Sequence, residues 1–158
     1  FGLAERLNVD RKEAKALIDG YFENYPNVKA YMDQSIQEAR EKGYIETIFK
    51  RKRYLPDINS KNAVVRGYAE RNAINAPIQG SAADIIKVAM IRIYQRFQEE
   101  GIRSKMILQV HDELNFSVLP EEKEKVQQIV ISEMEAAYKM KAPLRADHGW
   151  GHNWLEAH

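Results

Sequence analysis

The tripeptide His111-Asp112-Glu113 places two adjacent carboxylates between two short apolar runs, residues 105–110 and 114–118. Apolar residues alternate with other residues in each run, which predicts two half-buried strands joined by a tight turn. A carboxylate at the tip of such a hairpin can bind a hard cation that keeps positions for water and phosphate oxygens. Acidic residues are also common in turns for local hydrogen-bonding reasons, so a purely structural turn remains the alternative.

A second candidate is the set Arg71, Asn75 and Gln79, which recur every four residues and would form one polar stripe on a helix. Their side chains can donate to the minor-groove acceptors N3 and O2, which every Watson–Crick pair displays in nearly the same places. Such contacts would test base pairing without reading sequence. The alternative is a solvated polar face, or amides that hold a helix kinked at Pro77.

The elements that must position these residues are mostly helical. Asp10 is placed to cap a helix that ends at Pro26, and Gly43 suits a left-handed cap at the end of a second helix, near residues 28–41. The remaining elements are a short strand pair at 44–49 and 53–55, a long helix at 62–101, the 105–118 hairpin, a helix opened by Pro120, and a further strand at 144–147. The hairpin alternation predicts two apolar faces, Met106, Leu108 and Val110 on one strand and Leu114, Phe116 and Val118 on the other. The fold class is therefore α+β, with helices packed on a small antiparallel sheet.

Composition limits the function classes. The 158 residues carry 24 Lys+Arg and 23 Asp+Glu, a net charge of +1, so any phosphate-binding surface must be local. The candidate phosphate contacts are Lys50, Arg51, Lys52 and Arg53, for which a solvated turn is the alternative. The chain has no cysteine, which excludes disulfides and thiolate chemistry. No apolar run approaches membrane-spanning length, so we expect no membrane partner.

Five ordered motifs carry a resemblance that covers essentially the whole chain. They are GYIET at 43–47, RYLPDI at 53–58, NAPIQGSAADIIK at 75–87, QVHDEL at 109–114 and NWLEAH at 153–158. In this order they resemble the C-terminal part of the polymerase domain of family A DNA polymerases, the bacterial DNA polymerase I type. The chain departs from that pattern at Phe49-Lys50, where family members commonly carry a glycine in the turn.

The resemblance implies DNA-directed DNA polymerase activity: nucleotidyl transfer from a dNTP to a primer 3′-OH, serving DNA replication and repair. Asp112 would bind Mg²⁺ in a two-metal site, with Glu113 as a second, neighbouring catalytic carboxylate. The expected contacts to primer–template DNA are Phe1, Arg71, Asn75, Gln79 and His111. The alternatives to DNA contact are that His111 only orients Asp112 and that Phe1 belongs to a core.

The resemblance also implies a fingers-like helical segment with a short hairpin at residues 1–58 and a C-terminal palm segment at 59–158. The chain begins at Phe1, without Met, just beyond the second polymerase motif. We therefore expect a fragment of a cytoplasmic, nucleoid-associated bacterial enzyme whose metal site is completed by residues absent from this chain. Such a fragment would be inactive alone and able to self-associate through exposed core surfaces.

Two other function classes stay open on the sequence. One is a non-catalytic module that binds duplex DNA through the polar stripe and the basic run. The other is a metal-dependent phosphoesterase built on His111, Asp112 and Glu113, which would need several more clustered ligands. Near the C-terminus, Trp150 and Trp154 are expected to anchor the tail on the core. His148 and His152 could share a metal only in a helix, which Gly149 and Gly151 argue against.

Overall fold

A computed structural model describes residues 2–157, so the DNA contact expected of Phe1 lies outside the described residues. The fold is α+β, as predicted, with mostly helices and two separate two-stranded antiparallel sheets. Contacts between Cα atoms divide the chain into two compact units, residues 1–78 and 79–158. The boundary falls within one helix, α4 (Ala63–Glu99), which continues through Pro77.

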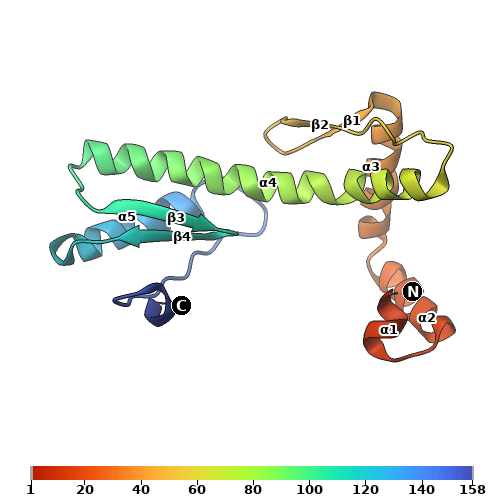
Figure 1. The fold of residues 1–158 in the computed structure, drawn as a ribbon, viewed down its shortest axis with the longest axis horizontal. Helices are drawn as coiled ribbons and strands as arrows, with labels where there is room; N and C mark the ends of the chain where they lie inside the picture. Colours follow the sequence, from red (N-terminus) through yellow and green to blue (C-terminus); the bar gives the residue numbers. More distant parts are fainter. Residues whose placement is uncertain (1, 158) are drawn as a thin grey trace. The chain divides into compact units, whose positions relative to one another are not determined.

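The first unit begins with three helices, α1 (Gly2–Leu7), α2 (Arg11–Asn24) and α3 (Pro26–Lys42) (Figure 1). Asp10 caps α2, since its Oδ1 accepts a hydrogen bond of 2.8 Å from the backbone N–H of Glu13. Pro26 both ends α2 and opens α3, because its missing N–H costs nothing at a first helical position. Gly43 closes α3 with φ 75°, the left-handed cap expected from the sequence.

A short hairpin follows, formed by β1 (Tyr44–Glu46) and β2 (Lys52–Tyr54). In its turn Lys50 has φ 64°, the left-handed region that glycine adopts most readily, at the position where the resemblance predicts a glycine. Thr47, which is buried, holds the turn: its Oγ1 accepts backbone hydrogen bonds of 3.3 Å from Phe49 and from Arg51.

The core of the first unit joins this hairpin to α3 and α4. The side of α4 that faces this core carries small residues, which lets the backbones approach closely. The buried residues are Ala39, Ile45, Leu55, Ile58, Ala69, Ala73 and Ala76.

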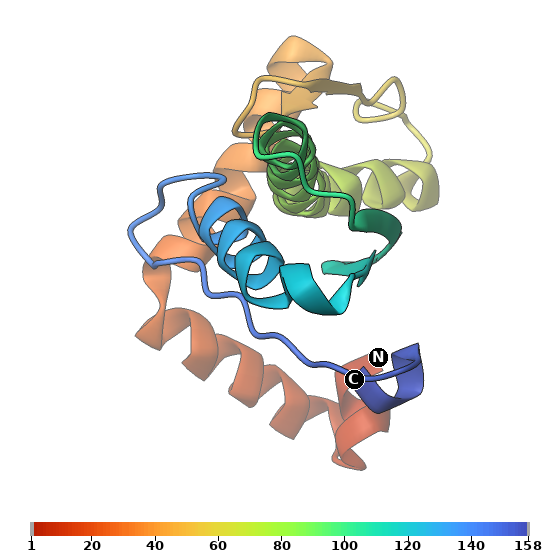
Figure 2. The same ribbon diagram turned by 90° about the vertical axis from the view of Figure 1, so that its left-hand side faces the viewer.

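The second unit packs the C-terminal half of α4 and helix α5 (Lys123–Glu135) with a hairpin of β3 (Lys105–Val110) and β4 (Glu113–Ser117). Figure 2 shows α5 beside this half of α4, and an ion pair of 3.0 Å between Arg96 and Glu133 joins the two helices. The buried core residues are Ala89, Ile93, Phe97, Val126, Ile129 and Ala137. A 3-10 turn, η1 (Pro120–Glu122), precedes α5, and α6 (Trp154–Ala157) closes the described chain.

The predicted apolar face of β3, formed by Met106, Leu108 and Val110, is wrong beyond Met106. Met106 pairs with Phe116, but the next pair is Leu108 with Asn115, so Ile107 is an extra residue in the ladder. Such a bulge reverses the alternation of side chains beyond it. Met106 therefore packs against the core, whereas Leu108 is 47% exposed.

The strand predicted at 144–147 is also wrong, because this segment is irregular. The backbone N–H of Ala146 donates to the carboxylate of Glu135 at 3.3 Å instead of to a neighbouring strand. Among residues 2–157, no helix has the length and apolar character needed to cross a membrane.

Candidate active site

The tip of the β3–β4 hairpin carries the predicted tripeptide. Val110 pairs with Glu113, which leaves His111 and Asp112 as a two-residue loop. His111 has φ 54°, a left-handed conformation in which histidine is found more often than most residues. The side chain of Gln109 donates to the His111 carbonyl at 2.6 Å and so ties the strand to the loop. Asp112 is thus held at the exposed end of a packed hairpin, as the sequence predicts.

The two adjacent carboxylates differ in their surroundings. Asp112 is exposed. Glu113 is half-buried, and its Oε1 accepts a hydrogen bond of 2.8 Å from the indole Nε1 of Trp154. This contact joins residues 41 apart in the chain, and no spacing rule could have predicted it. One carboxylate therefore faces solvent while its neighbour is engaged by the C-terminal turn.

Both carboxylates line a broad groove of about 830 Å³ in the second unit. Its apolar wall comes from β4 and α5 and includes Phe116 and Val130, and Arg145 lies in the segment that follows α5. The groove gives the hairpin tip an open side along which a large ligand can approach.

The donor set at the tip fits part of a magnesium site. Asp112 offers exposed carboxylate oxygens, the ligand type that Mg²⁺ prefers, and Mg²⁺ is commonly held by only one or two protein carboxylates. Within residues 2–157, no three His, Asp or Glu side chains converge on one metal-sized position. The segment that holds His148 and His152 is not helical, in agreement with the glycine argument.

The polar stripe is present on α4. Arg71, Asn75 and Gln79 all lie on this helix at four-residue spacing, and all are exposed. The guanidinium of Arg71 lies 5.8 Å from the centroid of the Tyr68 ring, which steadies it over the helix surface. The predicted helix and spacing are confirmed, and the DNA contacts of these side chains stay a prediction.

The basic run lies on the β1–β2 hairpin, where all four side chains are exposed. Lys50 lies 3.8 Å from the carboxylate of Glu46. Lys52 lies 4.3 Å from the Tyr44 ring centroid, and its hydrogen bond to Tyr44 raises the pKa of the ammonium group. Neighbouring side chains of the hairpin therefore orient both Lys50 and Lys52.

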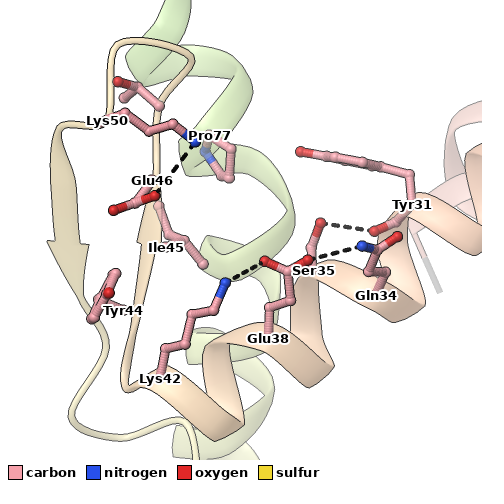
Figure 3. A pocket seen from close by; sticks show the side chains of 11 residues that line it. Tyr31, Gln34, Ser35, Glu38, Lys42, Tyr44, Ile45, Glu46, Lys50 and Pro77 are labelled. Atoms are coloured by element: carbon pink, nitrogen blue, oxygen red, sulfur yellow. Dashed lines mark hydrogen bonds and ion pairs between the residues drawn. The ribbon is translucent and has the colours of Figure 1, made fainter.

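A smaller cavity of about 280 Å³ lies in the first unit between α3, β1 and Pro77 (Figure 3). Its charged lining is paired, with Lys42 at 3.0 Å from Glu38, and Lys50 beside Glu46. The hydrogen bond between Lys42 and Glu38 raises the pKa of the lysine and lowers that of the glutamate. With its charges balanced, this cavity offers no net field that would attract a phosphate.

Known proteins resemble this chain over nearly all of its length. The sequence profile of DNA polymerase family A matches residues 1–156. DNA polymerase I of Streptococcus pneumoniae serotype 4 is 53% identical over 157 residues, and that of Bacillus caldotenax is 50% identical over 157 residues. Each match covers 99% of this chain and 18% of the relative, so the chain spans less than a fifth of the length of these proteins.

One solved structure is similar to the whole described fold. It is the POL domain of Pol1 from M. smegmatis in complex with DNA primer-template and dNTP. It matches with a TM-score of 0.96 and 45% sequence identity, over 99% of this chain and 28% of that one.

Proposed function

Because this chain belongs to DNA polymerase family A, we propose that it forms the C-terminal part of the polymerase domain of an enzyme that performs template-directed DNA synthesis. We call that longer enzyme the parent polymerase. It transfers a nucleotidyl group from a dNTP to a primer 3′-OH during replication and repair at the bacterial nucleoid in the cytoplasm. The observation that carries this proposal is the exposed Asp112 on a two-residue loop, within a region that matches the family throughout.

Asp112 would hold a Mg²⁺ ion together with ligands from other parts of the parent polymerase. When bound, two Mg²⁺ ions supply activation of the attacking hydroxyl and neutralise charge on the transferring phosphate. The packed strands on both sides of the loop restrict the Asp112 backbone, which pre-organises the ligand for its ion. Glu113 lies beside it as the secondary carboxylate. The 158 residues alone would not synthesise DNA, since Asp112 is one ligand among several.

Primer–template DNA would be held by the exposed polar stripe of α4 and by His111. The amide and guanidinium donors of Arg71, Asn75 and Gln79 suit minor-groove acceptors and would check base pairing without sequence preference. Phe1 is proposed to lie near the templating base on its family position alone. The basic run at residues 50–53 would contact phosphates, and each lost contact should reduce the slope of log affinity against log salt by about 0.9.

The two segments would play different parts in the parent polymerase. Residues 1–58 would belong to the fingers and residues 59–158 to the palm. Separated from the rest of the enzyme, the chain would self-associate through exposed apolar side chains such as Ile107 and Leu155, which are 62% and 89% exposed.

Magnesium-dependent primer extension tests this function when the parent polymerase and the 158-residue chain are assayed side by side. We expect extension by the parent alone. Failure of the parent to extend a primer would contradict the proposed function. Extension by the isolated chain would contradict the proposal that the metal site is completed by other parts of the parent polymerase. Duplex binding without any parent turnover would indicate a binding module. Hydrolysis of a phosphodiester by the isolated chain would indicate a phosphoesterase.

A further inference from the structure

A side-chain hydrogen bond joins the C-terminal turn to the β3–β4 hairpin. The indole Nε1–H of Trp154 donates to Oε1 of Glu113 at 2.8 Å. An indole N–H is a donor only, so it can satisfy a carboxylate without competing with it for a cation. Hydrogen bonds to an ionised carboxylate are shorter and stronger than those between neutral groups.

The one-turn helix α6 orients Trp154, and side-chain hydrogen bonds cap the N-terminus of this helix. Asn153 caps α6, since its Oδ1 accepts a hydrogen bond of 3.1 Å from the Glu156 N–H. In return the Glu156 carboxylate accepts from the Asn153 side chain at 2.7 Å and from the His152 backbone at 2.9 Å. This reciprocal arrangement resembles a capping box and fixes the residue that follows the cap. That residue is Trp154.

Two glycines let the turn fold back on itself. A Cβ on Gly149 would overlap the carbonyl oxygen of Ala157, and a Cβ on Gly151 would lie 2.5 Å from Cβ of Glu156. Such distances are shorter than real Cβ contacts, so both positions require the absence of a side chain. The turn is therefore a specific structure rather than a loose tail.

The chain has one other tryptophan, and its contacts are different. The indole N–H of Trp150 donates to the side-chain oxygen of Gln127 on α5 at 3.1 Å. The ammonium of Lys123 lies 4.7 Å from its ring centroid. Trp150 thus anchors the segment to α5, whereas Trp154 contacts a carboxylate next to Asp112.

We propose that Trp154 is a positioning residue, which holds the Glu113 carboxylate on the C-terminal turn and leaves Asp112 as the carboxylate of the pair that receives the metal ion. This role rests on the proposed function. Two neighbouring carboxylates on a short hairpin can otherwise compete for one cation and repel each other. Hydrogen-bonding partners around a metal site commonly control which ligand points at the ion, and their loss typically weakens metal affinity or activity 10- to 100-fold.

The contact itself can be tested in the 158-residue chain, because two tryptophans give two indole N–H signals in an NMR spectrum of ¹⁵N-tryptophan-labelled protein. Trp150→Phe and Trp154→Phe assign the signals. Glu113→Ala should shift the Trp154 signal and speed its exchange with solvent, and Gln127→Ala should act on the Trp150 signal. An unchanged Trp154 signal in Glu113→Ala would contradict the contact, whatever the chain's function.

The role is tested in the parent polymerase with Trp154→Phe, which removes the N–H and keeps an aromatic ring. We expect the Mg²⁺ concentration for half-maximal extension to rise about 10-fold, with primer–template affinity unchanged. Trp150→Phe is the matched control and should leave the Mg²⁺ dependence at the wild-type value. The double variant Trp154→Phe/Glu113→Ala should be no worse than Glu113→Ala, because both changes remove one interaction.

Several results separate the two proposals. A Trp154→Phe parent with wild-type Mg²⁺ dependence, or with the same change as Trp150→Phe, would contradict the positioning role and leave the polymerase function intact. Additive effects in the double variant would also contradict it. A wild-type parent that does not extend primers would instead contradict the proposed function.

Discussion

Val110 and Glu113 form the last cross-strand pair of the β3–β4 hairpin, so His111 and Asp112 make up the entire loop between the strands. His111 accommodates the tight reversal by adopting φ 54°. The candidate metal ligand is therefore attached to a residue in an unfavourable backbone conformation, a feature found more often at functional sites than elsewhere.

Two replacements of His111 that both remove the imidazole test the left-handed backbone conformation of the loop. His111→Gly should be more stable than His111→Ala by about 0.5–1 kcal/mol, because glycine relieves the left-handed strain but gains entropy in the unfolded chain. Urea denaturation of the two variants measures this difference in the free energy of unfolding. An alanine variant at least as stable as the glycine variant would show that the loop is not held in the left-handed conformation.

Lys50 provides the same test in the first unit, at φ 64°. Lys50→Gly should unfold at a higher temperature than Lys50→Ala, by an amount equivalent to about 0.5–1 kcal/mol. The ion pair with Glu46 is exposed, so its loss should matter little in either variant. Equal melting temperatures for the two variants would be inconsistent with the turn described here.

Glu122 should make the second unit sensitive to acid. Hydrogen bonds from the Ser104 side chain, and then from the Arg103 and Ser104 backbone N–H groups, lower the pKa of Glu122. Because the folded pKa lies below the unfolded one, this stabilisation is complete above the unfolded pKa and is lost as pH falls through the folded pKa. Glu122→Gln should lower the melting temperature near neutral pH, and its difference from wild type should shrink below about pH 4.

The control for this experiment is Glu124→Gln, which removes an exposed glutamate from the first turn of α5. It should change the melting temperature much less than Glu122→Gln at neutral pH. If Glu122→Gln lowers the melting temperature as much in acid as at neutral pH, the hydrogen bonds to Glu122 do not stabilise the fold through its charge.

Gln79 tests the polar stripe in the parent polymerase. Gln79→Ala should weaken primer–template binding about 5-fold, the equivalent of one net hydrogen bond of about 1 kcal/mol. Gln95→Ala removes another exposed glutamine from α4 and should leave DNA affinity unchanged. Equal affinities for the two variants would remove Gln79 from the proposed DNA contacts.

Local signals in the sequence predicted much of the fold. Asp10, Pro26 and Gly43 act at the helix ends where their backbone chemistry places them. The β3–β4 hairpin also follows from apolar alternation around a polar turn. Each of these features depends on residues a few positions apart, which is the range over which sequence patterns are informative.

The features that the sequence could not predict depend on tertiary structure. The extra residue at Ile107 reverses the alternation without any glycine or proline to mark it. The Trp154–Glu113 hydrogen bond joins residues 41 positions apart and needs the folded C-terminal turn. The sequence predicts that both tryptophans anchor the tail, but the carboxylate that Trp154 contacts becomes identifiable only in the folded chain.

The central claim is that Asp112 is a metal ligand of a polymerase active site, and single-turnover nucleotide incorporation by the parent polymerase tests it most directly. Asp112→Asn keeps the shape of the side chain and removes its charge. We predict a rate at least about 10³-fold lower at saturating dNTP and Mg²⁺, which corresponds to about 4 kcal/mol, with unchanged primer–template affinity. Asp19→Asn on the surface of α2 is the control and should retain the wild-type rate. Incorporation by a folded Asp112→Asn enzyme at the wild-type rate would contradict the account.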